Sequence, residues 1–252
     1  MIYSDISRML LFYILLISFI ATLVRSTFGF GESLVAVPLF SLLLPVDTAV
    51  PLSVMLSILI ALVVVVQDHE QIHFSSAKWL IIFALPGIPL GVLLLIYGNE
   101  LWIKTGLGIL LIVYSLYSLY GKNTFSLEKD NRFWLMACGL LSGILGGTYG
   151  VNGPPLVIYG NMRKWNARHF RATLQAYFLP ASFLGLIGYL FKGLVGKEIL
   201  TFFVASLPVV VPAIFLGRYI NHRLTDRSFF RYVYFGLVFI GAFLILNAFW
   251  VI

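Results

Sequence analysis

Long stretches of this chain carry almost no charge, and this limits its possible folds more than any other feature. Residues 46–66 contain one charged side chain, Asp47, and residues 229–252 contain one, Arg231. A helix of about 20 apolar residues is long enough to cross a bilayer. Since 60% of the residues are hydrophobic and 11% are charged, we expect an all-α polytopic membrane protein without a soluble domain.

The apolar segments fall into two classes of length. Two of them, 33–44 and 154–161, are shorter than the roughly 17 residues that a span requires, and we predict that they form re-entrant or broken helices. We predict about eight transmembrane helices from the longer segments, which are 9–26, 48–66, 79–97, 102–120, 133–148, 172–191, 198–216 and 229–250.

A glycine-rich stretch precedes each short segment. The stretches 27–32 (TFGFGE) and 148–155 (TYGVNGPP) begin 121 residues apart, with Thr, an aromatic residue and Gly in the same order. A helix can break inside a bilayer only where its freed backbone groups are sheltered or line a cavity. Broken helices at matching places in two halves indicate the substrate site of a transporter. The alternative is that these glycines only let helices pack closely.

The matching stretches divide the chain into three parts. These are a first membrane repeat (1–120), a connecting loop (121–132) and a second membrane repeat (133–252). With four full spans in each half, the two repeats would have the same orientation, and we favour this parallel arrangement. If the short segments crossed fully, the repeats would be inverted.

Lysine and arginine collect in cytoplasmic loops of membrane proteins. In the parallel arrangement, ten of them share the predicted cytoplasmic side: Arg25, Lys104, Arg163, Lys164, Arg168, Arg171, Arg218, Arg223, Arg227 and Arg231. The opposite side holds seven: Arg8, Lys78, Lys122, Lys129, Arg132, Lys192 and Lys197. This distribution explains the net charge of +7, so we expect the lipid bilayer as a partner and no nucleic acid.

The broken helices offer a way to bind an anion. A helix start exposes unpaired N–H groups and a partial positive charge. We predict that the backbone N–H groups of Gly29, Gly31, Gly150 and Gly153 and the side chains of Thr27, Thr148 and Asn152 coordinate an anionic head group. Phe28 and Tyr149 would close the two sides of this site. Ser53 and Ser57, which share a helix face, and Gln175 either line the site or bond across helices.

Charged residues near the breaks are further candidates. Acidic side chains in a bilayer are costly and usually mark ion or proton paths, so Glu32 is a candidate proton carrier. Alternatively, Glu32 lies at the membrane interface or pairs with Arg25 as a structural brace. Arg25, Arg168 and Arg171 are candidates for attracting an anion into the site.

Other chemistries have less support in the sequence. His69 and His73 have a spacing seen in metal sites but no clustered third ligand, so we expect no metal and no cofactor. An intramembrane enzyme would need a nucleophile, a metal set or paired acids, and Glu32 has no evident acidic partner. A passive anion channel and an assembly subunit remain as alternatives to a transporter.

The two glycine stretches also carry a family resemblance. The chain resembles the TauE/SafE family of membrane transporters at two segments. The first is Thr27–Gly31 with the following Val37-Pro38, and the second copy is Gly146–Pro154. The chain differs from that pattern at Glu32-Ser33, where further glycine is usual. The resemblance implies export of sulfite, sulfoacetate or a related organosulfur or organic anion across the bacterial inner membrane. It also implies transport driven by the electrochemical or proton gradient. From the two repeats we expect alternating access coupled to the proton gradient, in which one repeat rocks against the other about the predicted anion site.

Overall fold

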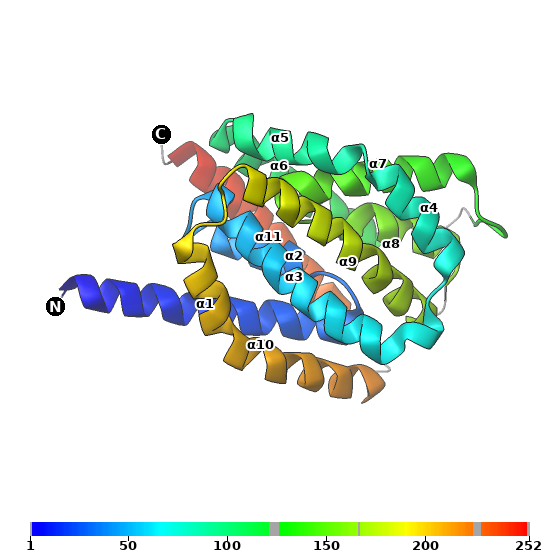
Figure 1. Cartoon of the computed structure of the whole chain (residues 1–252), viewed down its shortest axis with the longest axis horizontal. Helices are drawn as coiled ribbons and strands as arrows, with labels where there is room; N and C mark the ends of the chain where they lie inside the picture. Colours follow the sequence, from blue (N-terminus) through cyan, green and yellow to red (C-terminus); the bar gives the residue numbers. More distant parts are fainter. Residues whose placement is uncertain (1, 121–125, 166, 224–227, 251–252) are drawn as a thin grey trace.

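The computed structural model of the chain describes residues 2–120, 126–165, 167–223 and 228–250, and this part is entirely helical (Figure 1). The first half of the chain forms α1 (Ile2–Phe28), α2 (Glu32–Phe40), α3 (Val46–Asp68), a 3₁₀ turn (His69–Gln71), α4 (Phe74–Ala84), α5 (Gly87–Tyr97) and α6 (Glu100–Tyr120). The second half forms α7 (Arg132–Tyr149), α8 (Gly153–Met162), α9 (Ala167–Phe191), α10 (Lys197–Arg223) and α11 (Ser228–Trp250). The predicted all-α class is therefore confirmed.

Several of these helices can cross a bilayer. In the described part of the chain, α1, α3, α6, α9 and α10 are long and apolar enough to do so. Helices α4 and α5, which meet at a bend of 45°, give a sixth candidate when they are counted as one span. The bend lies at Leu85 and Pro86, so the segment 79–97 is not the single straight helix that we expected. The count of eight spans stays a prediction, since α7 and α11 are not among these six.

Both glycine stretches interrupt helices, as predicted. Helix α1 ends at Phe28 and α2 begins at Glu32, while α7 ends at Tyr149 and α8 begins at Gly153. Gly29 (φ +84°) and Gly150 (φ +66°) each follow the last residue of the preceding helix in a left-handed backbone conformation. Glycine adopts this conformation without the steric penalty that a Cβ atom brings, so it ends each helix sharply.

Two long pairs of parallel helices hold the bundle together. Along α1 and α10, the hydroxyls of Ser18 and Ser206 lie 3.3 Å apart, and Gly217 packs directly on Ser26. Along α7 and the α4–α5 pair, Gly139 packs on Leu80 and Gly147 packs on Ile88 and Val92. In addition, α3 packs along α9 and α6 along α11.

These contacts fix the direction of each helix. The residues around Asp130 define one end of the bundle, because Asp130 accepts hydrogen bonds from Ser76 and Arg163; we call it the Asp130 end. At the opposite end, Lys192 donates a hydrogen bond to Tyr97, and we call it the Lys192 end. Helix α10 starts at the Lys192 end and α1 runs parallel to it, whereas α7 and α4 both start at the Asp130 end (Figure 1).

The first two helices of each half form a hairpin. Helix α3 starts beside Gly98 and Leu194 at the Lys192 end, where α1 also starts, so α1 and α2 together return to the end from which they came. In the same way α7 and α8 return to the Asp130 end, since the backbone N–H of His73 bonds Thr173 near the start of α9.

Helices α1 and α7, the first helices of the two halves, run in opposite directions along the bundle. The parallel arrangement that we favoured is therefore wrong, because α1 and α7 begin at opposite ends. The predicted side also changes for four basic residues, one of which is Lys78 near the start of α4 at the Asp130 end. Lys129 and Arg132 lie at the same end as Arg163, to which Asp130 is bonded at 3.0 Å. Lys104 follows the start of α6 at the other end, where it pairs with Glu100.

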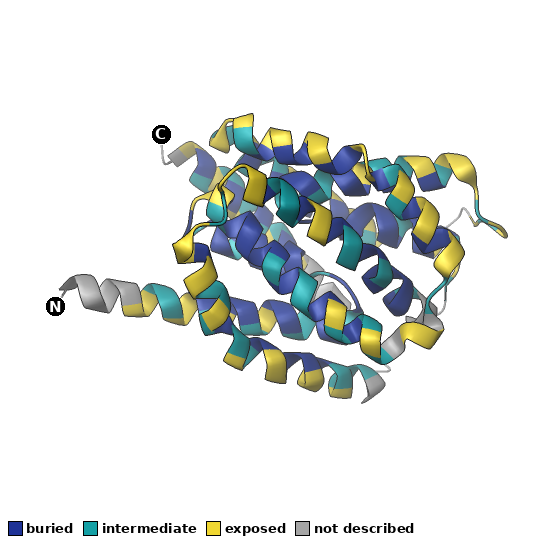
Figure 2. Ribbon diagram, viewed as in Figure 1, coloured by how far each residue is buried: buried dark blue, intermediate teal, exposed yellow. Residues whose placement is uncertain are grey.

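The two short helices occupy the middle of the bundle. All residues of α2 except Leu39, and eight of the ten residues of α8, are buried. The long helices surround them and are exposed on the outside of the bundle (Figure 2). The exposed apolar residues include Phe12, Trp102, Phe191 and Phe239, each more than 60% exposed. Large apolar patches of this kind suit contact with lipid rather than water.

Candidate functional site

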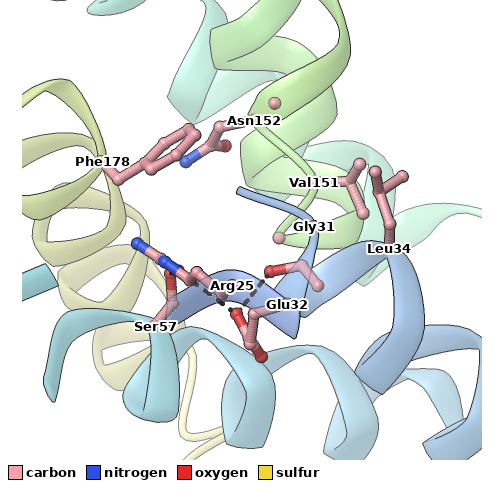
Figure 3. Close-up of a pocket in the computed structure, with 11 residues that line it drawn as sticks. Arg25, Gly31, Glu32, Leu34, Ser57, Val151, Asn152 and Phe178 are labelled. Atoms are coloured by element: carbon pink, nitrogen blue, oxygen red, sulfur yellow. Dashed lines mark hydrogen bonds and ion pairs between the residues drawn. The ribbon is translucent and has the colours of Figure 1, made fainter. Parts of the chain in front are cut away.

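A small pocket lies between the two helix breaks (Figure 3). It offers about 20 Å³ of space, which is enough for one water-sized group. The residues that line it come from the end of α1, the start of α2, the middle of α3 and α9, and the break before α8. They are Arg25, Gly31, Glu32, Ser33, Leu34, Ser57, Gly150, Val151, Asn152, Gly153 and Phe178.

An ion pair dominates this pocket. Nη1 of Arg25 lies 3.3 Å from Oε2 of Glu32, and the two residues are only 3% and 1% exposed. Ser53 donates a 2.8 Å hydrogen bond to the carboxylate, and Ser33 donates a second one of 2.9 Å. A buried ion pair is tolerated only when further hydrogen bonds satisfy its remaining groups, and these two serines do so for Glu32.

The guanidinium group of Arg25 is equally well held. It donates to Ser57, and its Nη2 and Nε atoms donate to Oε1 of Gln175 at 2.7 and 3.3 Å. The ring of Phe178, one helical turn after Gln175, lies 4.9 Å from the guanidinium carbon. An arginine keeps its charge in proteins, so this pocket contains a fixed cation.

Gln175 also supports the first break. Its Nε2 group donates a 2.7 Å hydrogen bond to the carbonyl oxygen of Gly29. One face of Gly29 is covered by the aliphatic part of Arg171, which lies about 3 Å from the position that a Cβ atom would take. The break is thus sheltered by α9, which meets the requirement for interrupting a helix at membrane depth.

The second break is supported by its own neighbours. Ser142 donates a 2.7 Å hydrogen bond to the carbonyl oxygen of Asn152, and Tyr189 donates one of 2.6 Å to that of Gly147. The side chain of Asn152 packs against Gly146 of α7 and does not cap α8. It lies on the side of the pocket opposite Glu32 (Figure 3).

The structure brings some of the predicted site residues together and separates others. Six of the predicted residues line the pocket: Arg25, Gly31, Glu32, Gly150, Asn152 and Gly153. Two more stabilise the ion pair, since Ser53 donates a hydrogen bond to Glu32 and Gln175 accepts one from Arg25. Glu32 does pair with Arg25, which was one of the alternatives for this residue. The side chain of Arg168 lies outside the described residues.

Other predicted site residues lie away from this pocket. The hydroxyl of Thr148 bonds the carbonyl oxygens of Gly91 and Ile144, and that of Tyr149 packs on Gly106 of α6. Thr27 and Phe28 do not line the pocket, and the carbonyl of Thr27 accepts a hydrogen bond from Asn221.

Two of the four backbone N–H groups that we predicted as anion donors already donate hydrogen bonds within the protein. The N–H of Gly29 bonds the carbonyl of Arg25, and the N–H of Gly150 bonds that of Gly146. Each closes the last turn of the helix before it, which is the usual role of a glycine at a helix end. Pro154 and Pro155 carry no N–H, so the start of α8 offers few donors. The cationic group of the pocket is therefore Arg25.

Some lining residues were not predicted. Ser33, Leu34, Val151 and Phe178 reach the pocket. Ser33 and Val151 are direct neighbours of predicted residues, and Phe178 shares a helix face with Gln175 because it follows three residues later. Helical spacing from Gln175 was the signal that could have identified Phe178.

Comparison with known proteins agrees with this architecture. A family model described as sulfite exporter TauE/SafE matches residues 14–244. A probable sulfite/organosulfonate exporter TauE from Cupriavidus necator is 25% identical over 187 residues, which cover 71% of each chain. No solved structure gives a significant match. Since the family model spans nearly the whole chain, this protein belongs to the sulfite exporter TauE/SafE family of membrane transport proteins.

Proposed function

We propose that this protein exports a small anion, namely sulfite, sulfoacetate or a related organosulfonate, across the bacterial inner membrane. The family and the named relative support an anion of this class. The observation that carries the proposal is the buried guanidinium of Arg25, which lies in a pocket between two interrupted helices. Arginine presents a planar fork of donors that suits oxyanions.

The pocket provides the other contacts that such an anion needs. The head group would bind Arg25, with the amide of Asn152 and the first backbone N–H groups of α2 as additional donors. Phe178 and Leu34 would contact a short carbon chain, if the substrate has one. Ser57 and Gln175 would keep the guanidinium in place.

The arrangement of helices supports alternating access. We propose that the segments 1–120 and 133–252 are inverted repeats, since α1 pairs with α10 in the same way as α7 pairs with α4 and α5. In transporters with inverted repeats, the substrate site lies between broken helices and one repeat rocks against the other. The ion pair of Arg25 and Glu32 has no counterpart in the second half, where Gly146 and Gly153 take the equivalent positions.

The charges also suggest an orientation. The Asp130 end carries Lys78, Lys129, Arg132, Arg163 and Lys164, whereas Arg8, Lys104, Lys192 and Lys197 lie toward the other end. Lysine and arginine favour the cytoplasmic side. We therefore propose that the Asp130 end faces the cytoplasm.

Counterflow in proteoliposomes tests this function against that of a passive channel. Vesicles loaded with unlabelled sulfoacetate should transiently accumulate labelled sulfoacetate from outside, since a carrier exchanges one molecule for another. Sulfate and taurine serve as competitors that differ in charge. Flux without any counterflow would contradict the carrier and favour a channel, and no flux of any tested sulfur anion would contradict the proposal as a whole.

A further inference from the structure

We propose that Glu32 is an internal substitute for the transported anion. In the empty carrier its carboxylate neutralises Arg25. When the substrate anion takes that place, Glu32 accepts one proton, so one proton travels with each monovalent anion. This inference rests on the proposed function and specifies how the same site couples the anion to the proton.

The geometry of the pocket argues for exchange rather than simple addition. Glu32 lies on the guanidinium at 3.3 Å, and the remaining space of about 20 Å³ fits only one water-sized group. A sulfonate group has three oxygens around sulfur and is larger than that space. A sulfonate therefore reaches Arg25 only if the carboxylate gives way.

The surroundings of Glu32 suit both of its protonation states. Ser53 and Ser33 donate to the carboxylate in the structure. A hydroxyl can accept as well as donate, and a protonated carboxyl has an O–H to offer. After separation from Arg25, a protonated Glu32 would thus keep hydrogen-bond partners on α2 and α3.

The charges nearby leave Glu32 as the group that balances Arg25. These two are the charged residues among those that line the pocket. Around them, α3 contributes Ser53 and Ser57 and α9 contributes Gln175, with Arg171 packed behind Gly29. Of the other helices that contact α2, α6 contains the buried Tyr114, and α11 contains Arg231, whose side chain lies outside the described residues.

Charge balance then explains the coupling. The empty site is neutral, with one cation and one carboxylate. With a monovalent anion the loaded site is neutral as well, since the substrate anion replaces the charge that the proton removes from Glu32. A site with the anion but no proton, or with the proton but no anion, carries a net charge, which is costly in a low-dielectric interior. Only the two neutral states would therefore reorient readily.

In this scheme one proton and one monovalent anion cross the membrane together, so no net charge is transported. The proton enters with the anion from one side of the membrane and leaves with it on the other. The direction of flux then depends on the anion gradient and the proton gradient together. Net export therefore requires an outward anion gradient that exceeds the inward proton gradient.

Proton uptake on binding tests the inference on the purified full-length protein. Methanesulfonate is a suitable probe because it is the anion of a strong acid and keeps its charge over the working pH range. In weakly buffered solution with a pH indicator, the wild-type protein should take up about one proton per methanesulfonate bound. Glu32→Gln should bind methanesulfonate without proton uptake and with an affinity that does not depend on pH. Glu198→Gln, which removes an exposed carboxylate from the first turn of α10, should behave like the wild type.

The outcomes separate the two proposals. Binding of methanesulfonate by the wild type without proton uptake would overturn the inference and leave the proposed function intact. Proton uptake that persists in Glu32→Gln would also overturn it. Absence of binding by the wild type to methanesulfonate, sulfite and sulfoacetate would overturn both. The wild-type measurement decides the matter even if Glu32→Gln does not fold.

Discussion

The guanidinium of Arg25 and the carboxylate of Glu32 face each other at 3.3 Å across the break that separates α1 from α2. The two residues are seven apart in sequence, and the left-handed turn at Gly29 reverses the chain between them. Each is buried, and each bonds side chains from other helices, since Gln175 lies on α9 and Ser53 lies on α3. This pair therefore joins four helices, α1, α2, α3 and α9, at the centre of the bundle.

The side chain of Asn152 should be needed for transport. It lines the pocket opposite Glu32, and its amide is a donor for the anion in our account. Asn152→Leu should reduce flux of sulfoacetate in proteoliposomes at least tenfold, while expression and elution from a sizing column stay the same. Flux like that of the wild type would argue against this assignment.

Two glycine substitutions should show whether transport depends on where the amide of Asn152 lies, without changing Asn152 itself. A Cβ atom at Gly146 would lie 1.6 Å from Oδ1 of Asn152, so Gly146→Ala should push the amide out of its place. A rotated side chain costs about 0.5–1.5 kcal/mol, so we expect a small change in Tm and a large loss of flux. Gly185→Ala on α9, where a Cβ atom meets nothing within 4 Å, is the matched control and should leave flux unchanged.

The close contact between α5 and α7 should depend on Gly147. A Cβ atom there would lie 2.3 Å from the carbonyl oxygen of Ile88 and 2.7 Å from the backbone nitrogen of Val92. Backbone atoms cannot move aside as a side chain can, and overpacking of this kind costs about 1–3 kcal/mol or more. Gly147→Ala should therefore lower the Tm in detergent by more than Gly146→Ala does. Equal Tm values for the two variants would contradict this packing.

Chemical labelling should reveal the two ends of the bundle. The native Cys138 is buried, so its background reaction with a maleimide should be low. In spheroplasts, Lys192→Cys should react with a membrane-impermeant maleimide, while Lys129→Cys should react only after the membrane is opened. Reaction of both under the first condition would contradict their placement at opposite ends, and the reverse pattern would invert the orientation.

The helix breaks could be predicted because glycine patterns reflect backbone geometry directly. Gly29 and Gly150 adopt conformations that other residues rarely take, and the sequence around them repeats. The directions in which the neighbouring side chains point could not be predicted in this way. Thr148 and Tyr149 precede Gly150 on the last turn of α7, and whether they face the pocket or α5 and α6 depends on how α7 packs. The repeated glycine pattern does not show how α7 packs against its neighbours.

The orientation of the halves could not be predicted for a similar reason. Segment 9–26 is long and apolar enough for a complete crossing, so the sequence predicts four full spans in each half. The structure pairs α1 with α2 in a hairpin that returns to the Lys192 end, so α3 starts at the end where α1 started. Contacts such as the ion pair of Arg163 with Asp130 show which loops lie at the same end of the bundle. The length and hydropathy of the segments do not contain this information.

The central claim is that Arg25 is the cation that binds the transported anion, and a comparison of two variants tests it most directly. Arg25→Gln leaves Glu32 buried without its cation, which should cost on the order of 3–5 kcal/mol and abolish flux. The double variant Arg25→Gln/Glu32→Gln removes both charges, so its Tm should recover toward that of the wild type while flux of sulfoacetate stays at background. Transport by the stable double variant at a rate near that of the wild type would contradict the account, because the pocket would then carry the anion without its cation.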